Sequence, residues 1–434
     1  MKYILKNGLT VIFQKNLNAQ VSALQVWINI GSRDELRAEN AEFQDEGGLA
    51  HIQEHMLFQG TKTFPFQGQI ANLVEAHGGE FNAWTNYDET VYHITMPSKN
   101  TELGLKILAS MVSEMTCEPD RLKKELEVVM EEFRRCNDDP HNVLQEELFK
   151  IAYDLHPYHH PVIGYEKTIK GIDQKTVLNF FNKYYTPSNM TLVVVSNIEE
   201  TDLKKMLQET FGKIKAKKCP KNIILQEPKQ KKPKIVIMQR NFEGTYLSFG
   251  YHVTAFKDKD TPVIDLIFTI LGNGFDSRLH KKLFEELKLV HSIFADAYTP
   301  KDAGFGFIDI ELDSDKIKKT LATVFQEIYK LQIEAVSKKE LEKAKLQIES
   351  QFIYSQETFQ DIARNLGQFE LIGGGYDKIQ KYLENLGKIT VKDVKRVAKK
   401  YLNKENVTIG LLVPKKEKIN ITEKEILENI NRGS

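Results

Sequence analysis

Apolar residues recur along this chain with two different periods, and the two periods predict a mixture of strands and helices. Alternating or continuous apolar runs predict strands over residues 3–5, 10–14, 21–30, 80–84, 90–96 and 190–196. Apolar positions three and four residues apart predict helices over residues 47–60, 67–77, 103–115, 120–135, 175–185 and up to about 211. The Asn7-Gly8 dipeptide between the first two strands is a strong hairpin signal.

The order of elements in the first half of the chain returns in the second half. A strand expected over 305–312 and a helix expected over 316–331 repeat the order of the strand over 91–96 and the helix over 103–115. An order of elements that recurs at half the chain length indicates duplication. We therefore expect an α+β fold of two homologous α/β sandwich domains, each a mostly antiparallel sheet covered by helices.

A lysine-rich segment with three prolines, over residues 213–234, separates the two halves. This composition is typical of a linker, so we predict an N-terminal domain over 1–212 and a C-terminal domain over 235–434. A basic segment of this kind can also attract an acidic peptide or a nucleic acid, but we interpret it as a solvated tether.

The helix predicted over 47–60 carries a candidate metal site. Its apolar stripe consists of Leu49, Ile52, Met56 and Leu57, and Gly60 is expected to end it. The polar side holds the run His-Ile-Gln-Glu-His, with His51, Glu54 and His55. Residues four apart share a helix face, so both imidazoles can reach one metal ion while Glu54 projects from the same side. A solvated polar face is the alternative interpretation.

The helix predicted over 120–135 offers the remaining ligand. Glu132 follows His55 by 77 residues, and Glu125 lies two turns earlier on the same line, at the margin of the apolar face. A carboxylate in such a place can be partly buried beside a metal ion, whereas Glu131 points away from that face. We predict Glu132 as the third ligand and Glu125 as the group that orients a ligand histidine. For Glu125, an edge carboxylate without a role is the alternative.

This ligand set predicts peptide-bond hydrolysis. Two neutral imidazoles and one carboxylate leave a zinc ion with a net positive charge and one position open to water. Glu54 is then placed to act as the general base. A nucleophilic serine or cysteine would need a neighbouring base and an orienting acid, which the sequence does not indicate. We expect one zinc ion per chain; manganese and cobalt accept the same ligands.

With these motifs the chain resembles the pitrilysin or insulinase family of metallopeptidases, and especially its half-length members such as the mitochondrial processing peptidase and its bacterial relatives. Runs similar to the family's occur at residues 31–35, 78–85, 89–92, 156–164 and 184–190. The resemblance implies that His51, His55 and Glu132 bind zinc and that Glu54 is the general base. It covers essentially the whole chain.

The resemblance also implies how a peptide is held. The run over 78–85 looks like the family's edge strand, to which an extended peptide adds as a further strand. Asn82 and Ala83 are the matching positions. For Asn82, a turn after the double glycine is the alternative interpretation.

The second half departs from the family pattern. Beyond a run similar to Leu-Gly-x-Gly-x-x-Ser-Arg-Leu, many members carry an arginine and a tyrosine that contact the substrate carbonyl; here Phe284 and His291 stand in their places. Phenylalanine cannot donate a hydrogen bond, whereas His291 can. We therefore expect the zinc-bearing subunit of a heterodimer, with a homodimer as the alternative, and a C-terminal domain that forms a substrate chamber or a partner contact. A non-catalytic scaffold subunit of the same fold is the rival function.

Charge and composition limit the partners and the compartment. Sixty basic residues balance sixty acidic residues, so no overall field favours nucleic acid or an anionic membrane. The sequence lacks a run of eighteen apolar residues, which predicts no membrane span. Cys117, Cys136 and Cys219 lack metal-type spacing and are expected to be free thiols. A cytoplasmic location is expected, with a periplasmic or organellar one after trimming as the alternative.

Overall fold

The chain, seen here as a computed structural model that describes residues 1–18, 20–35, 47–220 and 224–432, divides into two compact units that exchange segments. The first unit comprises Met1–Arg134, His160–Leu225 and Tyr354–Asp377. The second comprises Arg135–His159, Gln226–Ile353 and Lys378–Ser434. The ranges 1–212 and 235–434 predicted for the two domains, with a linker between them, do not include this exchange and remain a prediction.

The first unit is built on a six-stranded sheet with the order β1-β2-β6-β3-β5-β4. Its strands are β1 (Lys2–Ile4), β2 (Thr10–Lys15), β3 (Val21–Ile28), β4 (Glu80–Thr85), β5 (Thr90–Pro97) and β6 (Met190–Ser196). Strands β2 and β6 run parallel, and every other neighbouring pair is antiparallel. Strand β4 therefore forms one edge of the sheet, and its outer side has no partner strand among the described residues.

The second unit repeats this topology with five strands in the order β7-β11-β8-β10-β9. They are β7 (Lys234–Arg240), β8 (Thr245–Val253), β9 (Val290–Tyr298), β10 (Gly304–Leu312) and β11 (Val407–Pro414). As in the first sheet, one pair is parallel, β7 with β11, and the others are antiparallel. Strand β10 takes the place that β5 takes in the first sheet. The predicted α+β fold of two duplicated domains is confirmed.

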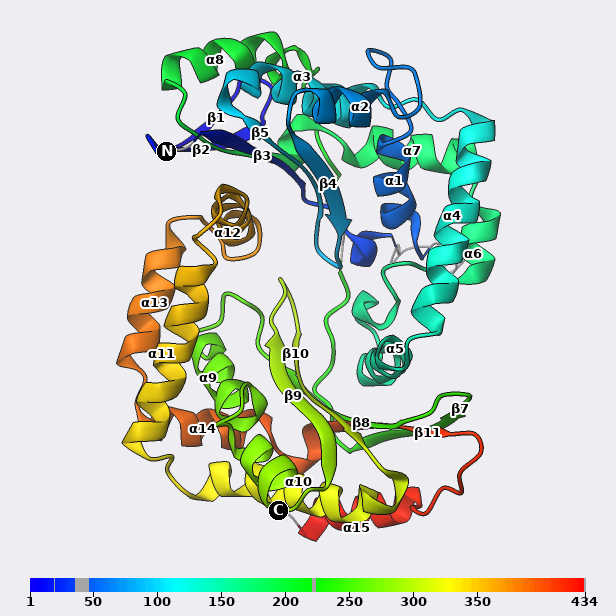
Figure 1. Cartoon of the computed structure of the whole chain (residues 1–434), viewed down its shortest axis with the longest axis vertical. Helices are drawn as coiled ribbons and strands as arrows, with labels where there is room; N and C mark the ends of the chain where they lie inside the picture. The colour runs from blue at the N-terminus through cyan, green and yellow to red at the C-terminus, as the bar shows by residue number, and fades with distance from the viewer. Residues whose placement is uncertain (19, 36–46, 221–223, 433–434) are drawn as a thin grey trace. The chain divides into compact units, whose positions relative to one another are not determined.

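Helices of the first unit cover one face of its sheet (Figure 1). Helix α3 packs on β3 and β5, and helix α1 packs on β4 and β5. The helices of this layer and those next to it are α1 (Leu49–Leu57), α2 (Gln69–Ala76), α3 (Thr101–Glu114), α4 (Pro119–Asn137), α6 (Glu166–Gly171), α7 (Gln174–Tyr184) and α8 (Glu200–Glu209). Apolar strand residues under this layer are fully buried, so it forms the core of the unit.

The opposite face of each sheet is covered by a helix from the other half of the sequence. Helix α12 (Phe359–Leu371) lies across β3 and β6 of the first sheet, and helix α5 (Pro140–Ala152) lies across β8 and β11 of the second. The approach of α12 is close: a Cβ atom at Gly367 would lie 2.1 Å from the Trp27 ring, so only glycine fits there. Each unit thereby gains the second helical layer of a sandwich.

The other helices of the second unit pack on the remaining face of its sheet or on one another. Helix α9 lies on β9 and β10, and α10 packs against α14 and α15. The helices are α9 (Thr261–Gly272), α10 (Ile317–Ile333), α11 (Lys338–Tyr354), α13 (Lys378–Lys388), α14 (Val391–Tyr401) and α15 (Glu423–Arg432). Within the described ranges no helix is long and apolar enough to cross a membrane. None of the three cysteines forms a disulfide.

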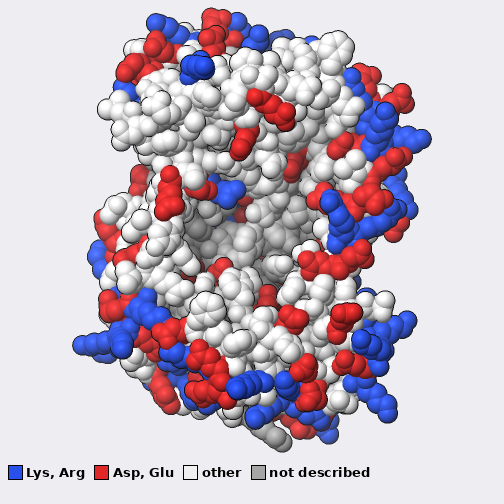
Figure 2. Space-filling view, in the orientation of Figure 1, with Lys and Arg blue, Asp and Glu red and all other residues white. Residues whose placement is uncertain are grey.

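Most predicted elements match the structure to within about two residues at each end, and the helix predicted over 47–60 differs most. Helix α1 is shorter than the predicted 47–60, because Gly48 has a left-handed φ of 98° and Phe58 ends the helix. Strand β3 stops at Ile28 rather than at residue 30. On the face shown in Figure 2, acidic and basic side chains are interspersed, as expected from their equal numbers.

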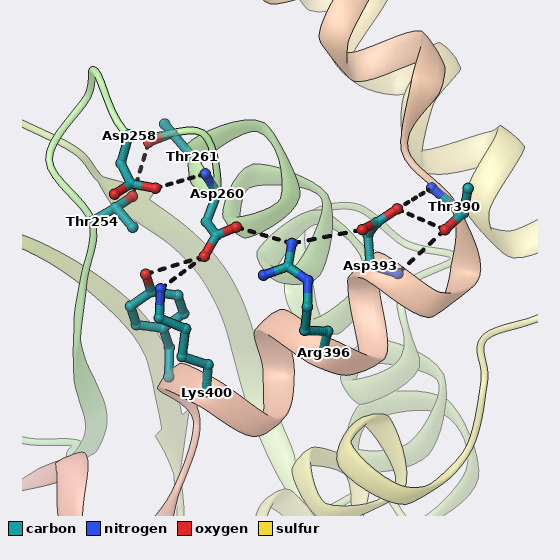
Figure 3. A network of polar contacts seen from close by, with 9 residues as sticks. Thr254, Asp258, Asp260, Thr261, Thr390, Asp393, Arg396 and Lys400 are labelled. Atoms are coloured by element: carbon teal, nitrogen blue, oxygen red, sulfur yellow. Dashed lines mark hydrogen bonds and ion pairs between the residues drawn. The ribbon is translucent and has the colours of Figure 1, made fainter.

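A buried carboxylate holds α14 against the start of α9 in the second unit (Figure 3). The Asp260 side chain is 1% exposed and accepts hydrogen bonds from Arg396 Nη2 at 3.0 Å and Lys400 Nζ at 2.9 Å. The Tyr401 hydroxyl donates a longer one at 3.3 Å. Burial raises the pKa of Asp260, but the bonds from Arg396 and Lys400 outweigh this effect and leave the pKa below its usual value.

Replacing Asp260 by asparagine should lower the free energy of unfolding by about 1–3 kcal/mol at pH 7, because two charge-assisted hydrogen bonds lose the carboxylate charge. Folding lowers the pKa of this carboxyl, so its contribution is present above the unfolded value of about 4 and is lost as the pH falls through the folded value. The two proteins should therefore converge in strongly acidic solution. Urea unfolding followed by circular dichroism measures both effects.

The matched control is Asp315→Asn, which makes the same chemical change on an exposed side chain. It should shift the free energy of unfolding by less than about 0.5 kcal/mol. Equal losses in the two variants would contradict a structural role for Asp260.

Candidate metal centre

A buried carboxylate anchors the beginning of α1. The Glu35 side chain accepts hydrogen bonds from the backbone N–H of Gly48 at 2.7 Å and of Ala50 at 2.6 Å. These N–H groups have no partner within the helix, and the positive end of the helix dipole favours a negative charge there. Glu35 belongs to the run over 31–35 but was not predicted to have this role. Its position could have been suspected only from that run.

Packing then sets the rotation of α1. Its stripe of Leu49, Ile52, Met56 and Leu57 is buried, at most 4% exposed. The imidazoles of His51 and His55 therefore project from the other side, with ring centroids 4.6 Å apart. This is the arrangement that the spacing of the two histidines predicted.

Helix α4 brings Glu132 to the two histidines. Its Oε2 atom lies 3.8 Å from His51 Nε2 and 3.5 Å from His55 Nε2. Two ligand atoms on one tetrahedral zinc ion are about 3.4 Å apart, so the donor set and its spacing fit zinc. Among the described residues, these three form the one group of metal-binding side chains close enough to share an ion. Glu131 is 68% exposed, in keeping with its predicted solvent position.

A chain of hydrogen bonds holds His55 from behind. Glu125 Oε1 lies 2.9 Å from His55 Nδ1, the contact predicted for an orienting carboxylate. Gln59 Nε2 donates to the other oxygen of Glu125 at 2.6 Å, and Gln67 Nε2 donates to Gln59 Oε1 at 3.0 Å. The bond to Glu125 leaves the Nε2 atom of His55 facing the site. Gln59 and Gln67 were not predicted, because no periodicity marks a residue that acts through another side chain.

The two imidazoles differ in their electrostatic surroundings. Burial lowers the pKa of His55, but its bonds with Glu125 and Glu132 outweigh burial and raise the pKa to about 9. Burial and the neighbouring His55 lower the pKa of His51 to about 4. The Nδ1 atom of His51 is buried and has no hydrogen-bond partner in the described part of the chain. The carboxylates around the pair thus favour a positive charge at the centre of the cluster.

Glu54 lies beside the cluster and is held by the edge strand. The Thr85 hydroxyl at the end of β4 donates to Glu54 Oε2 at 2.5 Å. Burial raises the pKa of Glu54, although the bond from Thr85 partly opposes it. A carboxylate with a raised pKa is better matched to proton transfer near neutral pH. Thr85 lies in the run over 78–85, but a role towards Glu54 was not predicted.

The predicted peptide-binding positions lie on this edge strand. Asn82 lies within β4 and pairs with His93 of the neighbouring strand β5, so it does not close a turn. Its side chain accepts a hydrogen bond from the backbone N–H of Ala83 at 2.8 Å. Ala83 and Thr85 share the face of β4 that points to α1, because side chains alternate along a strand. The edge position of this run is confirmed.

The two departures from the family pattern lie in the second unit. Phe284 is 42% exposed and stacks on His280, with ring centroids 4.8 Å apart. His291 is the second residue of β9, and its Nε2 lies 2.9 Å from Asp313 Oδ1. The candidate metal cluster in the first unit is formed by residues of α1, α4 and β4, and neither Phe284 nor His291 belongs to it. Their role towards a substrate remains a prediction.

Comparison with known proteins shows which family the chain matches. A family model described as insulinase, peptidase family M16, matches residues 10–166, and one described as the peptidase M16 inactive domain matches residues 171–348. An uncharacterised zinc protease of Bacillus subtilis is 25% identical over 413 residues, 95% of this chain and 98% of that protein.

Solved structures show the same fold over the whole chain. A protease from Helicobacter pylori has a TM-score of 0.88 at 26% identity, over 95% of this chain and 99% of that chain. The periplasmic protease PqqL of Escherichia coli has a TM-score of 0.81 at 20% identity, over 100% of this chain and 50% of that chain. The present chain thus has the length of the first protein and half the length of the second.

The two family models match consecutive parts of the sequence and together cover well over half of it. The His-x-x-Glu-His run and Glu132 fall within the first matched part. The chain therefore belongs to the insulinase family of peptidases, family M16, in its half-length bacterial form.

Proposed function

We propose that this protein is a zinc-dependent endopeptidase that hydrolyses extended peptides. The observation that carries the proposal is the convergence of His51, His55 and Glu132 on one point beside Glu54. Membership of the family and relatives named as zinc proteases support a peptidase function. In this proposal the two histidines and Glu132 hold the metal, and Glu54 is the general base.

The chemistry is divided among named side chains. A bound zinc ion would supply a Lewis acid that polarises the peptide carbonyl and lowers the pKa of water. Glu54 would accept a proton from the attacking water and deliver it to the leaving amine, so that one water and one peptide bond give a carboxylate and an amine. Thr85 orients Glu54 through its hydroxyl. Glu125 would hold His55 in the tautomer that a metal ligand needs.

The edge strand β4 supplies a binding place for the peptide. The outer side of β4 has no partner strand among the described residues, so an extended chain can add there as a further strand. Asn82 and Ala83 are the proposed contact residues on this strand. Because Thr85 in the same strand bonds Glu54, a peptide paired with β4 would run past the general base.

Replacing Glu54 by glutamine should lower kcat by about a hundredfold to ten-thousandfold, because the site loses its proton acceptor. Bound zinc should stay at one ion per chain, since Glu54 is not a proposed ligand. The measurement is hydrolysis of a quenched, unstructured peptide library by the zinc-loaded protein, with its partner subunit where activity needs one, next to a chelated sample. Glu131→Gln is the matched control, being the same change on a side chain that is 68% exposed. Undiminished hydrolysis by Glu54→Gln would refute the assignment.

Replacing Glu125 by glutamine should weaken zinc binding by about tenfold to a hundredfold, because partners behind a ligand histidine fix its orientation and basicity. Gln59→Leu should act in the same direction, since it removes a donor from Glu125. Competition with a coloured chelator measures the affinity. Glu127→Gln, an exposed position on the same helix, is the control and should bind zinc like the natural protein. Equal affinities for all four proteins would show that Glu125 has no orienting role.

We infer further that the chain is the zinc-bearing subunit of a heterodimer, with a homodimer as the alternative. The inference rests on Phe284 and His291, which stand where many relatives carry an arginine and a tyrosine. The purified, zinc-loaded chain should then show negligible hydrolysis, and a homologous subunit with that pair should restore it. Glu54→Gln in the restored complex should abolish it again. Full activity of a homogeneous homodimer would contradict this arrangement, and zinc binding without activity in any complex would favour the scaffold function.

A further inference from the structure

The edge strand β4 presents a second face, away from the metal centre. Phe81 and Thr85 point to α1, where they contact Phe58 and Glu54. Trp84 directly precedes Thr85, and successive side chains of a strand point to opposite faces, so the Trp84 side chain lies on the other face of the sheet. It shares that face with Trp27 and His93, at ring centroid distances of 5.5 Å and 5.4 Å. The indole ring is therefore fixed between two neighbouring strands.

Helix α12 places a cation over this indole. The central guanidinium carbon of Arg364 lies 4.7 Å from the centroid of the Trp84 ring, within the range of a cation–π contact. Arg364 is exposed. Among the described residues, no carboxylate lies within ion-pair distance of it. The guanidinium thus has an aromatic partner on one side and unused N–H donors at its edge.

Neighbouring groups do not balance this charge. Burial and Arg364 lower the pKa of His93 to about 4, so the imidazole is neutral near pH 7. Asp361, one turn earlier on α12, accepts a hydrogen bond from the hydroxyl of Thr358, the residue that caps this helix. Neither His93 nor Asp361 is an ion-pair partner of Arg364.

A peptide added to β4 would bring every second side chain to this face. Strands in a sheet lie about 4.8 Å apart, and directly opposed side chains point to the same face. The peptide side chain opposite Trp84 would therefore lie beside Arg364. Thr85, the next residue of β4, bonds the proposed general base, so this side chain belongs to a residue near the cleaved bond.

We propose that Arg364, stacked on Trp84, makes the protein select peptides with an acidic side chain within about two residues of the cleaved bond. This inference rests on the proposed peptidase function and on peptide pairing with β4. A guanidinium held on an aromatic ring keeps its edge free to donate parallel hydrogen bonds to a carboxylate. The chemistry that recognises the substrate is therefore an extended, acidic segment of peptide.

The test compares quenched peptides that differ only by Glu, Gln or Lys at each of the two positions on either side of the cleaved bond. The enzyme is the zinc-loaded protein, with its partner subunit where activity needs one. The natural protein should favour Glu over Lys at one position by about threefold to fivefold in kcat/KM, the range expected of a partly exposed ion pair. Arg364→Glu should invert the preference, and Arg364→Gln should abolish it.

Lys123→Glu is the matched control, because it changes the charge by the same amount on an exposed residue of α4. It should leave the Glu-to-Lys ratio unchanged. A ratio near one at all four positions, or a preference that survives in both Arg364 variants, would overturn the proposal. Either outcome would overturn selection by Arg364 without contradicting the proposed peptidase function, so the experiment distinguishes the failure of one hypothesis from the failure of the other.

A protein that cleaves none of these peptides would refute the proposed function itself. Specificity is then decided by binding, measured as fluorescence anisotropy of the same labelled peptides on the zinc-loaded Glu54→Gln protein. Tighter binding of the Glu peptide that is inverted in Glu54→Gln with Arg364→Glu would support selection by Arg364. Equal binding of the Glu and Lys peptides would overturn it.

Discussion

Burial of the apolar face of α1 decides where the candidate metal ligands point. Each of the four apolar side chains on this face contributes about 1.5–3 kcal/mol when it is removed from water. A rotation of the helix by one residue would expose part of the stripe and would carry His51 and His55 away from Glu132. The left-handed Gly48 and the carboxylate of Glu35 fix the point at which this helix begins. The positions of the candidate metal ligands thus depend on apolar packing to which those ligands do not contribute.

The polar side of this helix carries a cluster of charged and titratable side chains, and electrostatic interactions dominate there. Three carboxylates, Glu54, Glu125 and Glu132, face two imidazoles in a partly buried place. Burial disfavours charge on His51, Glu54 and His55, while the contacts between carboxylates and imidazoles favour opposite charges. A cation held by His51, His55 and Glu132 would offset the carboxylates, so the donor set fits a divalent metal ion.

The exchanged helices explain how one sheet can carry functional groups on both faces. Helix α12 covers the face of the first sheet that is turned away from the metal centre, and it does so from the second half of the sequence. Gly367 lets its backbone approach Trp27, and three residues earlier Arg364 reaches Trp84 on the edge strand. The edge strand therefore has the candidate metal ligands on one side and the Arg364 guanidinium on the other, although these residues are far apart in sequence.

By itself, the sequence determined the elements whose periodicity is strong and the ligands whose spacing is local. Strand β6 over 190–196, the duplication, and the placement of His51 and His55 on one helix face all follow from hydrophobic pattern and helix geometry. Glu132 could be predicted from the sequence because its helix has a clear apolar face, which shows where the Glu132 side chain lies. Tertiary structure alone decided the exchange of α5 and α12, the cap that Glu35 places on α1, the bonds from Gln59 and Thr85, and the stacking of Arg364 on Trp84. These contacts join residues whose separation in sequence carries no periodic signal, so they exist only once the sheets and helices have packed.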